Sequence, residues 1–485
     1  MHQRSSCRIF AILLSAFINF SRANLGLVLV VAGCTQNAGL PSSQSSAGSS
    51  SAGTSRAARM RSALPGDEVS NPISRKIRHV VIIVQENRSL NDLFNGFPGA
   101  ETVRVGKNSH NDFVSLAPRS LKAPYDLSHQ HVAFKTEYAN GLMNGFDLVK
   151  STCDKHKAKR CGPPHLRAYG YVPRREVEPY FTMAQRYVLA DHMFQTNEGP
   201  SFPAHQYILS GTSTISDDSP LRASENSHSP TKQLAGGCDS PKGSVVTVID
   251  PLGKENQSVY PCFNRTSIIE LLEARSLRWR YYQDHLGPGL WEGPDAILPV
   301  YDSPEFSRSV VTPPAHVLND ILARNLADVV WITPTPQASD HAEVTDGSGP
   351  SWVAAVVNEI GKSHYWNDTA IFVTWDDWGG WYDPIAPPEY NSYELGIRVP
   401  LLVISAYARQ HYISTKQHEF GSILKFTEEV FNLPSLGTTD ERSDDLSDCF
   451  DFAQKPRKFQ QIPAVLGADY FLRQPITSQS PDSDF

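Results

Sequence analysis

Several features that would define other classes of protein are missing from this sequence. It has no long run of basic residues and a formal net charge of −7, which argues against nucleic acid as a partner. No two of its seven cysteines have zinc-finger spacing, and no internal repeat is present. Its N-terminal apolar runs, at residues 9–17 and 25–32, are too short and too interrupted for a transmembrane helix.

What remains is the composition of an ordinary globular protein. The 485 residues are 40% apolar and 20% charged, enough for one large α/β domain, or two or three smaller ones, with a sizeable core. The 35 prolines and 31 glycines indicate that much of the chain lies in loops around that core.

The first 34 residues have the pattern of an export signal. Arg4 and Arg8 precede the apolar runs, as basic residues do in such signals. Residues 31–34 (VAGC) resemble a bacterial lipobox, which would make a lipidated Cys34 the mature N-terminus. The alternative is an ordinary secretory signal with a chance cysteine. We therefore expect an exported protein, periplasmic or at the cell surface, with membrane attachment through Cys34 if the lipobox is used.

Changes in composition mark the expected domain boundaries. Residues 35–71 are rich in Ser, Ala, Gly and Gln, which predicts a flexible tether. Residues 72–455 carry the strand and helix patterns and form the expected folded domain. Residues 456–485 are polar and rich in proline, which predicts a loose tail.

The cysteines beyond the signal suggest two local disulfides. Cys153 and Cys161 flank a short basic loop, and Cys238 and Cys262 flank a loop rich in Gly, Ser and Pro. In an exported protein both pairs are expected to be oxidised. This leaves Cys449, which we expect to be a buried free thiol.

Residues 79–95 (HVVIIVQENRSLNDLFN) are the stretch around which the chain is organised. The β-branched run 80–84 predicts a strand buried on both faces of a parallel sheet. It stops at Glu86 and Asn87, and open α/β sheets bind ligands at the carboxyl ends of their strands. The oxygen donors of Glu86 and Asn87 suit a divalent cation. The alternative is a strand followed by a capped helix, with Glu86 merely solvated.

Two further predicted strands also end in polar clusters. Residues 370–375 are followed by Asp376 and Asp377, and then by glycines that allow the backbone to approach closely. Residues 328–332 lead into the sequence Ser-Asp-His that ends at His341. Because crowded carboxylates are costly without a cation between them, these strand ends predict a metal site.

A fourth cluster precedes a predicted helix. Pro203 and the run AHQYIL follow Ser201, which is therefore expected at the helix N-terminus, where free N–H groups favour an anion. A hydroxyl at that position can attack phosphorus, although an N-cap is the commonest use of serine there. His205, one turn further on, lies on the same face and is predicted to contact a bound phosphate.

Five segments in this order carry a family resemblance: ENRSLNDLFNGFPGA (86–100), GPSFPAHQYILSGTS (199–213), SDH (339–341), TWDDWGGWYD (374–383) and IRVPLLVISAYAR (397–409). Together they resemble the bacterial phosphoesterase family of acid phosphatases and non-haemolytic-type phospholipases C, within the alkaline-phosphatase-like superfamily. The resemblance implies an α/β fold whose central sheet is mostly parallel, with helices on both faces and loop-rich insertions. It makes residues 72–455 the catalytic domain.

The resemblance also implies a metal centre and a nucleophile. Glu86, Asn87, Asp376 and Asp377 match positions that hold one divalent cation, and oxygen donors allow calcium, magnesium, manganese or iron. Ser201 matches the nucleophile, whose attack on phosphorus gives a phosphoseryl intermediate that water then cleaves.

Three histidines are expected to bind the phosphate. His129 lies in a segment that brings a histidine to the phosphate in the family, with His131 as the alternative. Asn144 stands behind it where the family usually has an acid, so a charged role at Asn144 is in doubt. His285 and His341 are the other predicted hydrogen-bond donors. One of His129, His285 and His341 is expected to protonate the leaving alcohol.

The sequence is compatible with two classes of phosphate ester as substrate. Family members of the phospholipase type generally carry threonine at the position of Ser201, and this chain ends soon after the catalytic core, so a broad-specificity acid phosphatase is expected first. A phospholipase C or phosphodiesterase acting on phospholipid head groups is the alternative. A surface-anchored protein that binds phosphate ligands without turnover is a third reading, which the intact Ser201 and paired aspartates argue against.

Overall fold

An eight-stranded sheet forms the centre of the protein. The structure, a computed structural model, describes residues 73–475, so the predicted export signal, Cys34 and tether lie outside the described residues. The strand order is β11-β10-β12-β1-β13-β14-β6-β15. In that order the strands are Val310–Val311, Trp279–Tyr282, Val329–Ile332, His79–Gln85, Thr369–Trp375, Leu401–Ser405, Val188–Ala190 and Tyr412–Ser414. β14 is antiparallel to both neighbours and all other pairings are parallel. The predicted mostly parallel α/β sheet is confirmed.

The two central strands are mostly apolar and are buried along almost their whole length. Every residue of β13 and all of β1 except its first residue are buried. Such runs suit a position between two layers of helices, since both faces of the strand are covered.

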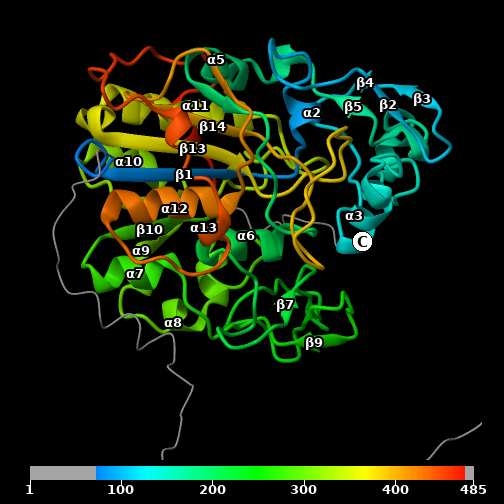
Figure 1. The fold of residues 1–485 in the computed structure, drawn as a ribbon, viewed down its shortest axis with the longest axis horizontal. Helices are drawn as coiled ribbons and strands as arrows, with labels where there is room; N and C mark the ends of the chain where they lie inside the picture. The colour runs from blue at the N-terminus through cyan, green and yellow to red at the C-terminus, as the bar shows by residue number, and fades with distance from the viewer. Residues whose placement is uncertain (1–72, 476–485) are drawn as a thin grey trace, which may run out of the picture. The chain divides into compact units, whose positions relative to one another are not determined.

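Helices cover both faces of the sheet. Phe372 and Trp375 of β13 differ by an odd number of positions and therefore point to opposite faces. Phe372 packs on Phe426 of α12, with ring centroids 5.0 Å apart, and Trp375 packs on Tyr180 of α5, at 5.1 Å. Helix α11 packs against α5 and α10, and α12 packs against α6 and α13; Figure 1 shows α12 and α11 on either side of the strands. The α-helices are α2 (Leu90–Leu93), α3 (His131–Tyr138), α4 (Ala158–Cys161), α5 (Glu178–Arg186), α6 (Ser201–Ser210), α7 (Ile268–Ala274), α8 (Leu298–Tyr301), α9 (Phe306–Ser309), α10 (His316–Leu322), α11 (Gly349–Lys362), α12 (Phe420–Phe431), α13 (Thr439–Arg442) and α14 (Ala468–Phe471).

The register of the sheet brings the polar strand ends together. Gln85 of β1 pairs with Trp375 of β13, so the next residues, Glu86 and Asp376, leave the sheet side by side. Backbone pairing continues past both strands, because Asp376 N–H donates to Gln85 O at 2.9 Å and Arg88 N–H donates to Asp377 O at 3.0 Å. The carboxyl end of the sheet is therefore where the functional residues predicted from the sequence gather.

Two smaller units lie beside the main core. One is a second hydrophobic cluster around Trp378 and Trp381, flanked by β2 (Val105–Lys107), β3 (Phe113–Ser115), β4 (Ala117–Pro118) and β5 (Gly170–Tyr171). The other is the sheet β7-β8-β9 (Arg222–Ala223, Val246–Ile249, Gln257–Val259) in the polar insertion, residues 214–264. Both predicted disulfides, Cys153–Cys161 and Cys238–Cys262, are present, and Cys449 is a buried free thiol as expected.

The packed part of the chain extends beyond the predicted boundary at residue 455. Ile462 is fully buried and its N–H and C=O bond the side chain of Asn358 on α11. Phe471 of α14 packs on Trp352, with ring centroids 5.2 Å apart. Residues 456–475 were predicted as a loose tail because they are polar and rich in proline, but a few apolar side chains anchor them to α11.

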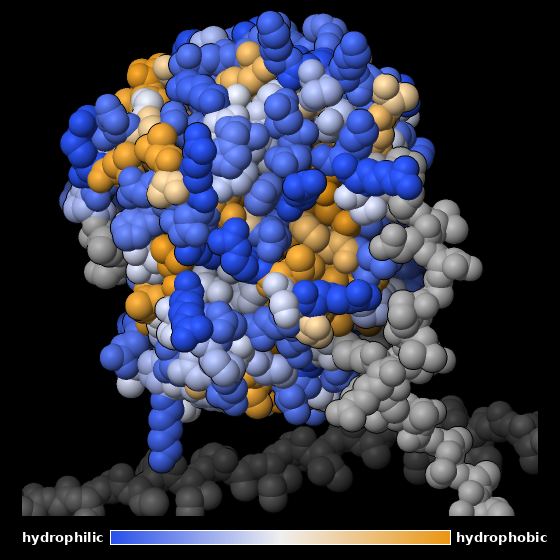
Figure 2. All heavy atoms as spheres, turned by 90° about the vertical axis from the view of Figure 1, so that its left-hand side faces the viewer, coloured by the Kyte–Doolittle hydropathy of each residue, from blue (hydrophilic) through white to orange (hydrophobic). Residues whose placement is uncertain are grey.

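Within residues 73–475, no helix is both long enough and apolar enough to span a membrane. The side of the molecule at the amino ends of the strands carries apolar groups in separate patches among hydrophilic ones (Figure 2).

Candidate active site

The ends of β1 and β13 are joined by side chains as well as by backbone. Asn87 N–H donates to Asp376 Oδ1 at 3.0 Å. Gly379 has φ near +60°, and a Cβ there would lie 2.4 Å from Asn87 O. The glycine after the paired aspartates is therefore required, since any side chain would push the two strand ends apart.

Ser201 lies against the second aspartate. It is the first residue of α6, and its Oγ donates to Asp377 Oδ2 at 3.2 Å, while Asp377 Oδ1 accepts the N–H of Gly379 at 2.7 Å. Ser201 and Asp377 are both fully buried. Residues 176 positions apart in sequence thus meet, as the hypothesis of a serine beside the aspartates required.

The N-terminus of α6 has fewer amide donors than the sequence suggested. Asn226 Oδ1 accepts the N–H of Phe202 at 3.0 Å, and Pro203 has no N–H. Of the first three helical residues, only Ser201 keeps an amide for an anion. The serine side chain and its own N–H are therefore the groups this helix end can offer to a phosphate.

His205, which the sequence predicts to contact a bound phosphate, lies with the acidic groups. Its Nε2 is 3.3 Å from Glu86 Oε1 and 3.9 Å from Asp376 Oδ2. Burial lowers the pKa of His205 to about 4, and the Asp376 carboxylate only partly opposes this. The ring is therefore neutral near pH 7.

The tautomer of His205 follows from its other nitrogen. Tyr281 Oη donates its one proton to Trp291 O at 2.7 Å, so it accepts from His205 Nδ1, 3.3 Å away. Nε2 is then unprotonated and turns a lone pair toward the two carboxylates. A lone pair that faces two carboxyl groups at this distance is an arrangement that a cation stabilises.

The donor set fits a divalent cation. Glu86, His205 and Asp376 each offer one atom within 4.8 Å of the others, and all three residues are buried. Asn87 Oδ1 and Asp376 Oδ2 are buried and make no hydrogen bond, which is costly unless a ligand occupies them. Oxygen donors with one imidazole suit manganese, iron or zinc as well as the harder cations. The sequence predicted Glu86, Asn87, Asp376 and Asp377 as candidate ligands. It did not add His205 to them, although the spacing of four residues between His205 and Ser201 on one helix was the available signal.

Two of the three predicted phosphate-binding histidines lie near this cluster. His129 Nε2 is 4.0 Å from Asp377 Oδ2 and accepts a hydrogen bond from Asn87 Nδ2 at 3.2 Å, while Nδ1 donates to Leu127 O. His341 follows β12, and its ring centroid lies 6.2 Å from that of His129. Both rings are buried and held through Nδ1 to backbone carbonyls.

His285 is not brought into contact with this group. It follows β10, and its nitrogens face Pro288 O at 3.2 Å and Glu292 Oε1 at 3.5 Å. The link to the cluster is indirect: Trp291, next to Glu292, accepts a hydrogen bond from Tyr281 at its carbonyl oxygen, and its ring centroid lies 6.5 Å from that of His341. A role for His285 on the leaving-group side stays a prediction.

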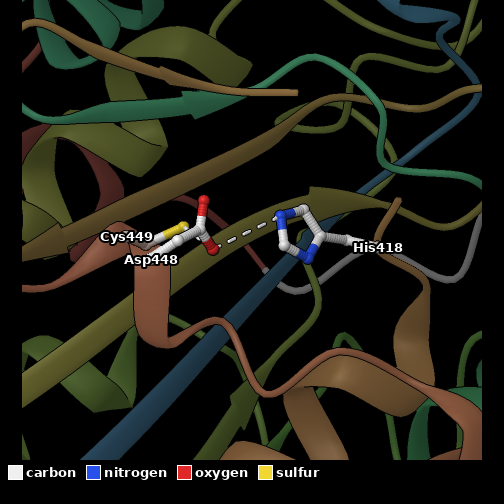
Figure 3. Close-up of side chains that lie close together, drawn as sticks. All are labelled: His418, Asp448 and Cys449. Carbon is white, nitrogen blue, oxygen red and sulfur yellow. Dashed lines mark hydrogen bonds and ion pairs between the residues drawn. The ribbon is translucent and has the colours of Figure 1, made fainter. Parts of the chain in front are cut away.

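A second group of potential ligands lies far from these strand ends. His418, Asp448 and Cys449 gather near β15 (Figure 3). Here Ser414 Oγ fills the space between the polar groups, 2.8 Å from His418 Nε2 and donating to Asp448 Oδ2 at 2.6 Å. Burial raises the pKa of Cys449 well above its usual value, so its thiol is protonated. The group is a hydrogen-bonded structural contact and a poorer metal site than the strand ends.

The fold and the site together define an α/β protein with a serine beside a candidate cation centre at the carboxyl edge of its sheet. The phosphoesterase family model matches residues 77–434, and the chain belongs to the phosphoesterase family. It is 23% identical over 468 residues to the non-hemolytic phospholipase C of Pseudomonas aeruginosa, covering 84% of this chain and 62% of that protein. It is 22% identical over 443 residues to phospholipase C A of Mycobacterium tuberculosis, covering 78% of each.

The chain thus spans less than two thirds of the length of the Pseudomonas protein. Among solved structures, a protein in the alkaline phosphatase superfamily from Vibrio parahaemolyticus is similar, with 12% identity and a TM-score of 0.34 over 76% of this chain and 70% of that one.

Proposed function

We propose that this protein hydrolyses phosphoric esters through a phosphoseryl intermediate on Ser201, with monoesters as the preferred substrates. The observation that carries the proposal is the hydrogen bond from Ser201 Oγ to Asp377, directly beside the cluster of Glu86, Asp376 and His205. Membership of the phosphoesterase family supports the same chemistry.

Hydrolysis of a phosphate ester needs alignment and neutralisation of charge more than unusual covalent chemistry. Ser201 Oγ attacks phosphorus as its proton passes along the 3.2 Å hydrogen bond to Asp377; the Oγ–P bond forms and the ester P–O bond breaks. A divalent cation held by Glu86, Asn87, Asp376 and His205, with Asp377 beside it, would supply positive charge that favours the ionised serine. A neighbouring histidine then takes a proton from water, which attacks phosphorus and cleaves the Oγ–P bond, and Asp377 returns the serine proton to Oγ.

The leaving alcohol needs a proton from a neighbouring imidazole. His129 and His341 are the two predicted donors whose rings lie together. His129 Nε2 accepts a hydrogen bond from Asn87, so His129 can donate through that atom only as an imidazolium. This supports a working pH on the acid side of neutrality.

A second candidate function is cleavage of phosphodiesters, as in a phospholipase C. It is favoured by the curated relatives, which are phospholipases C in Pseudomonas and Mycobacterium. Serine at position 201 supports the monoester reading, because the phospholipase members generally carry threonine there.

Two chromogenic substrates test these alternatives. Turnover of p-nitrophenyl phosphate and of p-nitrophenylphosphorylcholine is measured for the wild type, with and without a chelator, and for Ser201→Ala. We expect preference for the monoester, inhibition by the chelator, and a loss in Ser201→Ala of at least roughly 10³-fold. Ser267→Ala, which removes the capping serine of α7, is the matched control and should keep full turnover.

Acid quenching followed by mass spectrometry should find phosphate on the peptide that contains Ser201. Preference for the diester would replace our first choice with the second. Full activity in Ser201→Ala would remove the nucleophile assignment, and tight phosphate binding without turnover would favour a binding protein.

A further inference from the structure

Two neighbouring turns beside the second core expose large apolar side chains. Phe113 of the β2–β3 hairpin is 78% exposed, and Leu142 and Leu148, in the turn after α3, are 64% and 60% exposed. Residues of this size are rarely left so open on adjacent turns unless they meet a partner.

Side-chain hydrogen bonds fix the two turns together. Asn144 Nδ2 donates to Asn111 Oδ1 at 3.1 Å, and Ser109 Oγ donates to Asp147 Oδ2 at 2.7 Å. Asn144, which stands where the family usually has an acid, is thus one of the residues that joins the turns. Figure 1 shows β2, β3 and α3 gathered beyond the carboxyl end of β1.

The loop that follows Leu148 is strongly basic. Residues 150–160 contain five exposed cations, Lys150, Lys155, Lys157, Lys159 and Arg160, and one acid, Asp154. The whole chain, by contrast, has a net charge of −7. The disulfide Cys153–Cys161 closes this loop, and Arg167 anchors it by donating to Ser151 Oγ at 2.7 Å and Thr152 O at 2.9 Å. The charge is therefore concentrated on a restrained loop next to the apolar turns.

We propose that these residues form a docking surface for an anionic phospholipid bilayer. This basic–apolar surface consists of Phe113, Leu142, Leu148, Lys150, Lys155, Lys157, Lys159 and Arg160. Cations near an anionic leaflet are attracted to lipid phosphates, and exposed aromatic and leucine side chains gain by entering the head-group region. A soluble polyanion would pair with the cations but has no apolar region that Phe113 and the two leucines could enter.

Docking of this kind would bring the region of His129 close to the lipid, since the N–H of the preceding Ser128 donates to Lys150 O at 2.9 Å. The inference does not rest on the proposed function, because it concerns binding and is measured without turnover.

Co-sedimentation of the full chain with vesicles tests the charged half of the surface. Vesicles of phosphatidylcholine alone are compared with vesicles that also contain phosphatidylglycerol. The quadruple variant Lys155→Gln, Lys157→Gln, Lys159→Gln, Arg160→Gln should bind the anionic vesicles at least about tenfold more weakly than the wild type. The matched control changes four exposed cations elsewhere, Arg175→Gln, Arg308→Gln, Lys455→Gln and Lys458→Gln, and should stay within about twofold.

The double variant Phe113→Ser, Leu142→Ser tests the apolar half of the surface in the same co-sedimentation assay. It should also bind anionic vesicles more weakly than the wild type, and this loss should persist at high salt, where the charge contribution is screened. Its control, Leu322→Ser with Val465→Ser, removes side chains that are 63% and 95% exposed elsewhere and should bind like the wild type. Any contribution of the N-terminal segment is common to all the proteins, so the differences between them carry the result.

Melting temperature and the far-UV circular dichroism spectrum should be unchanged in all four variants, which shows that they are folded. Equal vesicle binding by the wild type and both surface variants would overturn the proposal, as would absence of binding by the wild type. If the charge variant loses retention on heparin while the apolar variant changes nothing in either assay, the partner is a soluble polyanion and the proposal is wrong.

Discussion

At the scale of single residues, His205 shows how one hydrogen bond decides a chemical role. The sequence places it one turn after Ser201, which predicted contact with a bound phosphate. The structure turns its Nε2 lone pair to Glu86 and Asp376, because Tyr281 Oη accepts a hydrogen bond from Nδ1–H and so keeps the proton on Nδ1. A phosphate would meet an unprotonated nitrogen there, whereas a cation would meet a ligand.

Replacing His205 with alanine should therefore reduce the metal bound by the protein. Affinity should fall by at least about tenfold, because a donor within the cluster is lost. Metal content after gel filtration, measured by inductively coupled plasma mass spectrometry, checks this. His316→Ala, an exposed histidine on α10, is the control. Normal metal content with impaired turnover would instead assign His205 to the phosphate, as the sequence suggested.

Single residues were also where sequence reasoning succeeded best. Glu86, Asn87, Asp376 and Asp377 could be predicted to converge because they follow buried strands, and the carboxyl ends of parallel strands share one edge. The contact from Tyr281 to Trp291 O could not be predicted, since no pattern in the chain specifies a bond between a side chain and the carbonyl of an unrelated loop.

At the scale of elements, a buried ion pair holds the polar segments after β1 and β13 together. Arg398 Nε donates to Asp383 Oδ1 at 2.9 Å, and both side chains are fully buried. Asp383 Oδ2 also accepts the N–H of Asn91 in α2 at 3.2 Å. Burial raises the pKa of Asp383, and Arg398 opposes that shift. Asp383 thus orients a loop and lies outside the candidate cation cluster.

Arg398→Met should destabilise the protein by about 3–5 kcal/mol, because it leaves Asp383 buried without its counter-charge. Urea unfolding followed by fluorescence measures the change. Arg308→Met breaks an exposed pair with Glu305 and should cost about 1 kcal/mol or less. The double variant Arg398→Met, Asp383→Asn should recover part of the loss. Additive losses would mean that the two residues do not stabilise the fold as a pair.

At the scale of the whole molecule, His131 links the polar insertion to the rest of the chain. Its Nε2 lies 3.3 Å from Glu198, just before Ser201, and its Nδ1 lies 3.1 Å from Glu255 in the insertion. Its N–H donates to Glu225, also in the insertion. Burial is the largest single influence on the pKa of His131 and lowers it, but the hydrogen bonds to Glu198 and Glu255 together raise it to about 9.

Stability should therefore depend on pH through His131. The unfolded chain has a histidine pKa near 6.5, so the protonated ring contributes its full stabilisation below about pH 6.5, and this is lost as the pH rises to about 9. Melting temperatures of the wild type and His131→Gln, compared across that range, check this. The advantage of the wild type should shrink with rising pH; a constant difference would contradict an ionised His131.

The sequence by itself determined the central strands of the sheet and the edge at which the polar residues gather. Short apolar runs rich in β-branched residues, such as 80–84 and 370–375, predict central strands, and the polar residues after them are then expected to meet at one edge of the sheet. Tertiary structure alone decided which atoms face one another: the His205 lone pair toward Glu86, the His131 bridge to Glu255, and the packing of Phe471 on Trp352. Local pattern fixes periodicity and burial, whereas these contacts depend on the relative placement of segments far apart in the chain.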